Sequence, residues 1–413
     1  MAERDGHDGQ SRGRGSADFG AARRSRRQRF GFAGWFYLGT TIIIALGGVN
    51  SQNNLLFLAF GVAIAGLLLS GMVGGTSILN VRAERVLPAE AIAGEPMAVR
   101  YRVRNSGRVL PSFCLTFEEL PDAPGRDESP EVRRSRRQAE RNGESARFAA
   151  PPLAAVLHVG PGEGLTAEGL AAPARRGMLK LDRFVVHSRF PFGLIRKIVE
   201  FSQPQRLLVH PAQLAVRRDV LRLPRRGGQS GLDASARVGR GEELFGVREY
   251  VPGDSPRDIA WRASARSSNL LVREWAAPRP LRLWIVLTVR PGDDATHAET
   301  AIALAASIVR MAASREDLAV GLAAPGVGLL SPPRSARSAR GPLLNALAMI
   351  DLTKPHESAN EEKALSVPAR SMVIAIHADE VRASSVPAGA THLLASKPEA
   401  WMTPGAPAGK EPA

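Results

Sequence analysis

Two uncharged apolar runs set the strongest limit on how this chain folds. They are Phe32–Val49 and Leu55–Leu79, and five polar residues, Asn50–Asn54, separate them. The first run has 18 residues, and a helix that rises about 1.5 Å per residue spans roughly 27 Å over that length, close to the hydrocarbon thickness of a bilayer. The pattern predicts a transmembrane helical hairpin over residues 32–79. It disfavours a pair of buried core helices, and a signal peptide, because no small-residue cleavage site follows the first run.

Arginine placement predicts the orientation of this hairpin. Positively charged residues flank the cytoplasmic ends of membrane helices, and the turn Asn50–Asn54 carries none. We therefore expect a multi-pass protein of the cell (inner) membrane with both termini in the cytoplasm. The flanking arginines are Arg23, Arg24, Arg26, Arg27 and Arg29 before the first run, and Arg82 and Arg85 after the second.

Aromatic and small residues suggest how the hairpin is held. Trp35 and Tyr37 lie at the cytoplasmic end of the first run, where amphipathic rings anchor a helix at the level of the lipid headgroups. Gly71 and Gly75 are four residues apart in the second run, a spacing that lets another helix approach closely. That helix is either the first helix of the same hairpin or a helix of another molecule. A homo-oligomer and contacts with other membrane proteins both stay open.

The segments around the hairpin differ in composition. Residues 1–31 are basic and lack apolar periodicity, so we expect a disordered segment. Residues 80–210 alternate apolar and polar side chains between Gly and Pro turns, which predicts a small β-sandwich-like domain with a charged insertion at 122–147. Residues 211–239 are expected to form a linker, and residues 397–413 a disordered tail. Candidate strands are Val99–Val103, Phe113–Phe117, Leu153–Val159, Leu179–His187 and Leu194–Phe201.

Residues 240–396 are predicted to combine a charged motif with an α/β domain. Leu281–Val289 is a nearly continuous apolar run, typical of a strand buried on both faces, and Ala298–Ala313 has apolar residues at helical spacing. Alternating strands and helices imply a parallel, Rossmann-like sheet, so the chain as a whole is expected to be α/β plus all-β. The further candidate elements are a strand at Leu318–Ala323, a mobile loop at Ser331–Arg340, a helix at Pro342–Ile350 and a strand at Ser371–Ile376.

The motif Val238–Trp275 holds the densest set of chemical features, with six arginines and six acidic residues. A turn at Pro252–Asp254 and a capping serine predict a helix over Pro256–Arg266, whose apolar face would dock onto the α/β sheet. The charges either form a salt-bridge network that shapes the motif, or present guanidinium groups to an acidic partner segment or a phosphate. Candidate residues for these roles are Arg248, Glu249, Tyr250, Gly253, Asp254, Arg257, Asp258, Trp261, Arg262 and Arg266.

This motif resembles the hallmark of a bacterial membrane-protein family known as domain of unknown function 58. The similar residues are Arg248-Glu249-Tyr250, Pro252-Gly253-Asp254, Arg257, Ile259, Trp261 and Ala265-Arg266. Arg189–Leu194 and Asn53–Leu56 resemble its second signature and its membrane anchor, so the resemblance covers most of residues 32–323. It implies a two-helix anchor, a β-rich domain and a von Willebrand factor A-like α/β domain. It also implies a gene neighbourhood with a MoxR-type AAA+ ATPase and transglutaminase-like membrane proteins.

The resemblance raises the question of a metal site. Many von Willebrand A-like domains hold Mg²⁺ through an Asp-x-Ser-x-Ser motif after the first strand, because this cation needs several oxygen ligands. This chain has Thr288–Gly292 there, and although Asp293 and Asp294 lie close, we expect no metal and no other cofactor. The histidines near apolar runs, His187, His210 and His377, are expected to be structural, and Cys114 to be a buried residue within a strand.

The leading functional hypothesis is a membrane-anchored, cytoplasm-facing adaptor or scaffold that works with an AAA+ ATPase in envelope-related assembly. No Walker motif and no nucleophile elbow occur in the sequence, so ATP hydrolysis would come from the partner. The alternative is a membrane-associated hydrolase or transferase that uses the acidic and arginine residues of the motif. Nucleic-acid binding rests only on the net charge of +15. Much of that excess lies in the N-terminal segment, the membrane flank and the linker, so we expect no nucleic-acid partner.

Overall fold

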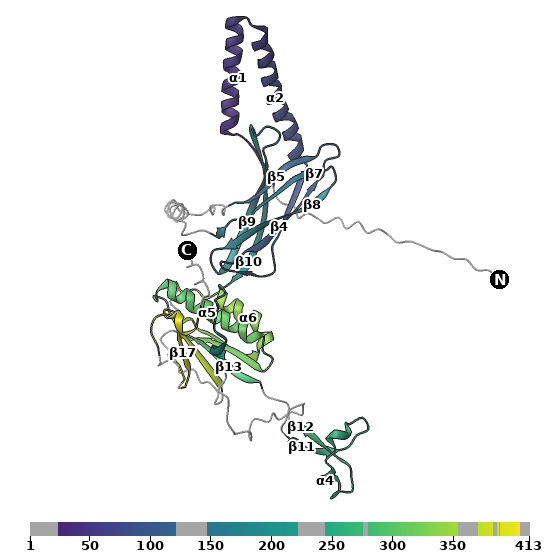
Figure 1. The fold of residues 1–413 in the computed structure, drawn as a ribbon, viewed down its shortest axis with the longest axis vertical. Coiled ribbons are helices and arrows are strands. Elements are labelled where there is room, and N and C mark those ends of the chain that lie inside the picture. Colours follow the sequence, from purple (N-terminus) through teal and green to yellow (C-terminus); the bar gives the residue numbers. More distant parts are fainter. Residues whose placement is uncertain are drawn as a thin grey trace, which may run out of the picture. The chain divides into compact units, whose positions relative to one another are not determined.

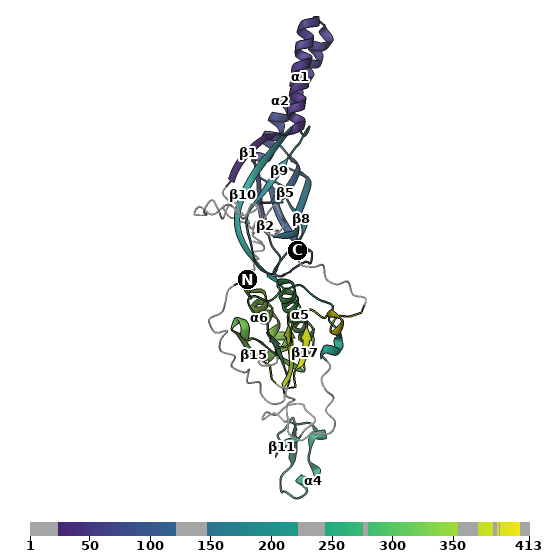
Figure 2. The same ribbon diagram turned by 90° about the vertical axis from the view of Figure 1, so that its left-hand side faces the viewer.

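The computed structural model describes residues 24–120, 147–221, 244–275, 280–353, 371–382, 386–387 and 389–404. The chain divides into two compact units, drawn as ribbons in Figures 1 and 2. The first unit comprises Met1–Ala91, Glu95–Ala174 and Leu179–Leu207, and the second comprises Ile92–Gly94, Arg175–Met178 and Leu208–Ala413. The charged insertion expected at 122–147 and most of the linker expected at 211–239 lie outside the described residues.

Two antiparallel helices, α1 (Phe32–Ser51) and α2 (Asn54–Leu79), form the expected helical hairpin. Gln52 ends α1 with a left-handed φ of 44°, and the Asn53 side chain starts α2 by accepting a hydrogen bond of 2.9 Å from the Leu55 N–H. Two stretches of these helices, Phe32–Ser51 and Asn54–Met72, are long and apolar enough to cross a membrane. Only 17% and 6% of these stretches are buried within the protein, which distinguishes them from the helices of a soluble core.

A short strand precedes α1, contrary to the disorder expected for residues 1–31. Strand β1 (Arg24–Phe30) pairs in an antiparallel manner with the start of β10 (Ile195–His210), and Figure 2 shows the two strands side by side. The sequence does not predict this strand, because its arginine-rich residues do not alternate between apolar and polar. Its stability comes from backbone pairing with a neighbouring strand, which sequence patterning does not reveal. Residues 1–23 lie outside the described part of the chain.

The rest of the first unit consists mainly of two β-sheets, in line with the all-β expectation. One sheet has the order β1-β10-β9-β5-β7, with β3 also pairing with β10, and the other has the order β2-β4-β8-β6. Among the expected strands, Leu153–Val159 is confirmed with the same bounds, whereas Leu194–Phe201 is only the first half of β10. Besides β1 and β10, the strands of these two sheets are β2 Val81–Val86, β3 Ala91–Ile92, β4 Met97–Asn105, β5 Ser112–Glu119, β6 Phe148–Ala150, β7 Leu153–Val159, β8 Gly164–Pro173 and β9 Gly177–Ser188.

Aromatic side chains join the two sheets of this β domain. The Tyr101 ring on β4 lies 5.0 Å from the ring of Phe117 on β5 and 5.4 Å from that of Phe184 on β9, both in the opposite sheet. Within that sheet, Phe184 stacks on Phe201 of β10 at 5.2 Å. All four residues are at most 1% exposed, so they form the core between the sheets. Cys114 does not belong to this core, contrary to expectation. It is exposed and has a positive φ of 49°.

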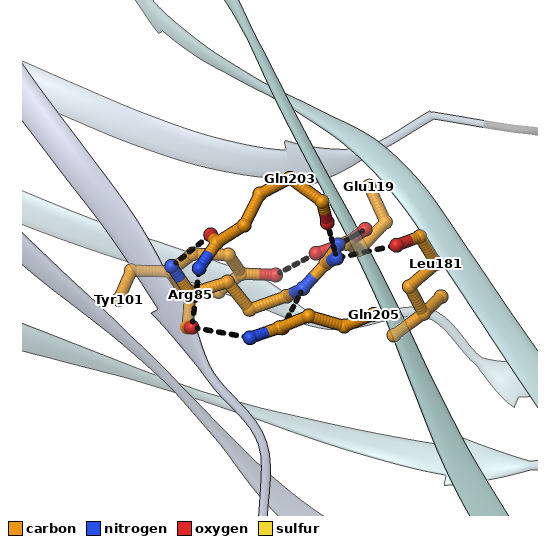
Figure 3. Close-up of polar contacts among 6 residues, drawn as sticks. All are labelled: Arg85, Tyr101, Glu119, Leu181, Gln203 and Gln205. Carbon is orange, nitrogen blue, oxygen red and sulfur yellow. Dashed lines mark hydrogen bonds and ion pairs between the residues drawn. The ribbon is translucent and has the colours of Figure 1, made fainter. Parts of the chain in front are cut away.

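A network of polar groups is buried within the same core (Figure 3). The Arg85 guanidinium donates to the Glu119 carboxylate, the Gln205 side chain and the backbone carbonyls of Leu181 and Gln203. Tyr101 donates to the second carboxylate oxygen of Glu119 at 2.8 Å. Burial raises the pKa of Tyr101 and of Glu119 above their usual values, although the neighbouring Arg85 partly offsets this effect for Glu119. Full hydrogen bonding allows these charges to stay inside the domain.

The second unit contains an α/β domain built on one five-stranded sheet of order β15-β14-β13-β16-β17. Strands β14, β13, β16 and β17 are parallel, and the edge strand β15 is antiparallel. The apolar runs predicted at Leu281–Val289, Leu318–Ala323 and Ser371–Ile376 correspond to β13, β14 and β16. The bounds are β13 Leu281–Leu287, α5 Ala295–Ala313, β14 Leu318–Ala324, β15 Leu329–Ser335, α6 Ala336–Ala348, β16 Ser371–His377 and β17 Thr391–Leu394.

Two segments expected to be irregular are ordered parts of this domain. The predicted loop Ser331–Arg340 forms most of β15 and the beginning of α6. Strand β15 tolerates two prolines because it is an edge strand. It pairs with a neighbour on one side only, so some of its backbone positions need no N–H donor. The predicted tail contains Trp401, which is 1% exposed and donates from Nε1 to the Leu394 carbonyl at 2.8 Å. A large apolar side chain near a chain end holds the backbone against the core, while residues 405–413 lie outside the described part.

Part of the expected linker also packs on this domain. Leu221 is 4% exposed and belongs to the same core as the sheet, and Leu214 and Val216 pack against that core. A short 3-10 helix, η1 (Arg218–Leu221), ends this segment. Apolar residues at 214, 216 and 221 among arginines therefore mark a packed segment rather than a free linker.

Candidate functional site

Residues 244–275 form a small structure of their own, here called the hairpin module. Strands β11 (Leu244–Glu249) and β12 (Leu271–Trp275) pair antiparallel, with a register shift between Leu244 and Gly246. The connection between them contains a 3-10 helix, η2 (Pro256–Asp258), and a single helical turn, α4 (Trp261–Ser264). The motif residues Arg240, Glu242 and Glu243 precede the described part of this module.

The turn that leads out of β11 has the geometry that its sequence predicts. Gly253 has a φ of 112°, a conformation that side chains rarely adopt. The Asp254 carboxylate accepts a hydrogen bond of 2.9 Å from the Val251 N–H, and Ser255 caps η2 by accepting from the Arg257 N–H. Gly253 and Asp254 therefore fix the direction in which the chain enters the connection.

The helix predicted over Pro256–Arg266 does not form as one piece. Ile259 interrupts it with an extended backbone, φ −65° and ψ 127°, and forms an isolated β-bridge with Val272 of β12. Both side chains are buried, at 6% and 4% exposure. Burying Ile259 against the hairpin outweighs the helical preference of its neighbours, since local propensity differs by less than about 1 kcal/mol per residue. The apolar face expected to dock onto the α/β sheet is thus used inside the module.

Arg248 is the centre of an ion network within the module. Its two terminal nitrogens donate to the two carboxylate oxygens of Asp254, each at 2.6 Å, and its Nε donates to Glu274 at 3.0 Å. A fork of this type fixes geometry as well as charge. The hydrogen bonds from Arg248 and from the Val251 N–H lower the pKa of Asp254 to about 2, and those to Asp254 and Glu274 raise the pKa of Arg248.

The other two carboxylates of the candidate set are also engaged. Glu249 accepts from the Asn269 side chain at 2.7 Å, and Asp258 accepts from the Trp275 indole N–H at 3.0 Å. Sequence reasoning missed Asn269, Glu274 and Trp275 as partners, although Glu274 and Trp275 lie in the apolar and charged alternation of the last strand. Of the three carboxylates Glu249, Asp254 and Asp258, only Asp254 is paired with an arginine, and the other two accept from Asn269 and Trp275 within the module.

Three arginines of the candidate set differ from Arg248. Arg257, Arg262 and Arg266 are exposed, and within the described residues their guanidinium groups have no hydrogen bond or ion pair. Trp261 lies among them and is 62% exposed. Within the described residues, Arg248 is therefore paired inside the module, whereas Arg257, Arg262 and Arg266 are exposed and unpaired.

Apolar side chains are exposed on the same module. A hairpin of this size buries little of its own apolar surface, and an isolated two-stranded hairpin is only marginally stable in water. Contiguous exposed apolar surface with a polar surround is typical of interaction sites. The exposed apolar side chains are Leu244, Phe245, Val247, Tyr250, Val251, Trp261 and Leu270.

The membrane-anchor candidates lie in several environments. Trp35 is 63% exposed at the start of α1, but the Tyr37 hydroxyl donates to the Ala63 carbonyl at 3.0 Å and so links the two helices. Gly71 has nothing within 4 Å of an added Cβ, so it is not a close-packing residue of the hairpin. That role falls to Gly66, whose added Cβ would lie 2.9 Å from the Tyr37 hydroxyl. The surroundings of Gly75 are outside what the structure describes.

The resemblance suggests that a cation could bind at the carboxyl end of β13, so the contacts of the side chains there decide whether one fits. Both carboxylate oxygens of Asp293 bind the Arg382 guanidinium, at 2.5 and 3.0 Å, and one also accepts from the Arg290 N–H at 2.8 Å. Burial raises the pKa of Asp293, but these hydrogen bonds outweigh it and the pKa lies below its usual value. Among the described residues no group of three His, Cys, Asp or Glu side chains could hold a metal. The donor set does not fit a divalent cation.

A histidine pair lies beside this ion pair. His377 is fully buried, its Nδ1 lies 2.7 Å from the Thr288 hydroxyl and accepts from the Arg382 N–H, and its Nε2 lies 2.9 Å from Nδ1 of His392. Burial and the nearby His392 and Arg382 lower the pKa of His377 to about 4. His187 and His210 also have side-chain partners, Arg196 and Asn345. All three histidines are hydrogen-bonded parts of the structure.

One comparison with known families matches this region. Residues 246–387 match the family model described as "Protein of unknown function DUF58", about a third of the chain. The match covers most of the hairpin module and the sheet from β13 to β16. The helical hairpin and the β domain lie outside it. No curated protein shows significant similarity to the chain.

Proposed function

We propose that the protein is a membrane-anchored adaptor or scaffold, in which the hairpin module binds an acidic surface of an AAA+ ATPase of the MoxR type. The helices α1 and α2 would span the cell membrane, with both termini in the cytoplasm, and the partner would supply ATP hydrolysis for envelope-related assembly. The observation that carries the proposal is the set of exposed, unpaired guanidinium groups of Arg257, Arg262 and Arg266, on the same connection as the exposed Trp261.

The membrane part of this proposal is supported by the two long apolar helices and their low burial. The arginines Arg27 and Arg29 before α1, and Arg82 after α2, support the cytoplasmic location of both termini, because cytoplasmic flanks carry the positive residues. The tip of the hairpin between Ser51 and Asn54 carries no charge.

The α/β domain supports the suggested family relationship. Its first strand, β13, is central. The next two strands, β14 and β15, lie to one side of it, and β15 is the antiparallel edge strand. We propose a von Willebrand factor A-like fold on this basis. The pair Asp293–Arg382 stands where the resemblance raised a cation, so a partner would be bound without a bridging metal.

An acidic protein surface fits the module better than a nucleic acid. The module has five arginines against four acids in its described residues, and three of those arginines are grouped on the connection. Arginine and tryptophan are enriched among the residues that contribute most to binding between proteins. The charge is too local and too nearly balanced for the electrostatic footprint that nucleic-acid binding needs.

Co-purification in mild detergent tests the proposal. The full chain is compared with a variant carrying Arg257→Glu, Arg262→Glu and Arg266→Glu, and with a control carrying Arg100→Glu, Arg102→Glu and Arg104→Glu on the exposed face of β4. We expect an AAA+ ATPase to be enriched with the full chain and the control, and lost with the first variant. An ATPase retained by the first variant, or absent from all three, would refute the docking role.

A further inference from the structure

The end of the β domain next to the helices exposes apolar side chains on its loops. Val109 and Leu110 lie in the loop between β4 and β5, Phe192 lies in the loop between β9 and β10, and Leu157 lies near the end of β7. Their exposed fractions are 81%, 43%, 55% and 80%. These four residues are called the juxtamembrane face below.

Backbone hydrogen bonds fix both loops to the ends of the helices. The Gly31 N–H, one residue before α1, donates to the Leu194 carbonyl at 3.2 Å. The Ser106 N–H donates to the Asn80 carbonyl, one residue after α2, at 2.8 Å. Strand pairing gives the same placement, because Val81 pairs with Asn105 at the end of β4. Figure 1 shows these strand ends at the foot of the two helices.

The two loops are also joined to each other. The ring of Phe113, at the start of β5, stacks on the ring of Phe190 with centroids 4.6 Å apart, and the Ser188 hydroxyl donates to the Phe113 carbonyl at 2.8 Å. The Asn105 side chain donates to the Leu110 carbonyl at 2.9 Å and holds the first loop in place. The exposed apolar side chains thus project from a rigid platform.

This platform lies at the level where α1 begins. Phe192 is two residues from Leu194, so it lies within about 7 Å of the hydrogen bond to Gly31 along the chain. The headgroup layer adds roughly 5 to 7 Å to the hydrocarbon core on each side of a bilayer. If α1 spans the hydrocarbon from Phe32, Phe192 is therefore held within the reach of the headgroup layer. Lys197, two residues after the start of β10, contacts α2 close to this level, because its ammonium group donates to the carbonyls of Ser70 and Gly71.

The charges on these loops favour an anionic surface. Arg108 and Arg189 are exposed on the same two loops as the apolar side chains, and Arg29 is exposed just before α1. Exposed basic residues next to a membrane are attracted to anionic headgroups, and apolar side chains beside them enter the headgroup and acyl boundary.

We propose that the juxtamembrane face binds the anionic lipid surface, with Phe192 and Val109 inserted at the headgroup and acyl boundary and Arg108 and Arg189 paired with lipid phosphates. This inference rests on the membrane location in the proposed function, and it adds that the β domain itself touches the bilayer. The domain is thus held against the membrane by three contacts: the hairpin and the two loops.

Fluorescence quenching in vesicles tests this contact on the full chain. The single cysteine is removed with Cys114→Ser, and an environment-sensitive dye is attached to Phe192→Cys, Val109→Cys or Leu153→Cys. Leu153 is the matched control, because it is 68% exposed on β7 but lies at the other end of that strand. A dye at Leu46→Cys, in the second half of α1, reports whether the hairpin is inserted. The vesicles contain phosphatidylcholine and phosphatidylglycerol with spin-labelled acyl chains.

We expect quenching at 46, roughly half-maximal quenching at 192 and 109, and none at 153, because interfacial side chains lie about 5 to 10 Å into the boundary. If the dye at 46 is quenched but the dyes at 192 and 109 are quenched no more than the dye at 153, the lipid contact is refuted and the membrane anchor is retained. No quenching at 46 refutes the membrane location and this inference with it. In vesicles of phosphatidylcholine alone, the quenching at 192 and 109 should fall, and an unchanged value would overturn the role of Arg108 and Arg189.

Discussion

Nη1 of Arg85 lies 2.6 Å from Oε2 of Glu119 in the core of the β domain, and the two side chains are 0% and 4% exposed. Arg85 also donates to Gln205 and to the carbonyls of Leu181 and Gln203, and Glu119 accepts from Tyr101 (Figure 3). A buried charge of this kind is held only as long as its partner is present, because desolvation of a single ion costs several kcal/mol.

Arg85→Met is predicted to destabilise the β domain by about 3 to 5 kcal/mol, since it leaves the Glu119 carboxylate buried without its counter-charge. Adding Glu119→Leu to Arg85→Met should restore much of the loss, because no uncompensated ion remains. Chemical denaturation in detergent measures both. As a control, Arg100→Met removes an exposed pair with Glu168 and should cost less than about 1 kcal/mol. Equal losses for the two single variants would contradict the buried pair.

The joint between α1 and the β domain is predicted to be intolerant of side chains. A Cβ at Gly34 would collide with the Leu194 carbonyl, whereas a Cβ at Gly39 of the same helix meets nothing within 4 Å. Gly34→Val should therefore lower stability by about 1 to 3 kcal/mol, the usual cost of overpacking. Gly39→Val should be neutral. Thermal unfolding of the detergent-solubilised chain compares them, and a similar midpoint for both would rule out the close approach.

The α/β domain is predicted to lose stability in mild acid through His377. The pKa of His377 is about 4 in the folded protein and about 6.5 in an unfolded chain. A lowered histidine pKa means that the unfolded state binds the proton first, so stability is complete above pH 6.5 and falls as the pH approaches 4. The loss is up to about 3 kcal/mol. His377→Asn keeps an acceptor for the Arg382 N–H and should flatten this part of the pH profile, measured by denaturation between pH 7 and pH 4.

The hairpin module is predicted to depend on Asp254. Asp254→Asn removes the fork on Arg248, so backbone amides of β11 and β12 should exchange faster with solvent, while those of β13 and β14 stay protected. Asp317→Asn, which removes an exposed local fork with Arg315, is the control and should leave the module unchanged. Hydrogen exchange with mass spectrometry resolves the two regions. Because the pKa of Asp254 is about 2, the fork should persist at pH 4.

Sequence patterning predicted the elements that depend on a long, regular signal. The helical hairpin and the strands β13, β14 and β16 are continuous apolar runs, and hydropathy alone locates them. Strand β1 was missed because Arg24–Phe30 has only polar residues, four of them arginine, before Phe30. Strand β8, Gly164–Pro173, was missed because its glycines, alanines and proline read as a turn.

The candidate site was predicted in residue type but not in arrangement. Arg248 and Asp254 are close in sequence, and their turn could be anticipated. Their partner Glu274 depends on the register of the hairpin, in which Gly246 pairs with Glu274 and Arg248 with Val272. The helix over Pro256–Arg266 was wrong because its capping signals are local, whereas the burial of Ile259 against Val272 is a tertiary effect.

Only Asn80 separates α2 from β2, and the bonds at Gly31 and Lys197 attach both helices to the β domain. A joint with several attachments resists bending more than a single flexible connection does. A force on the β domain is therefore passed to both helices rather than to one connecting segment.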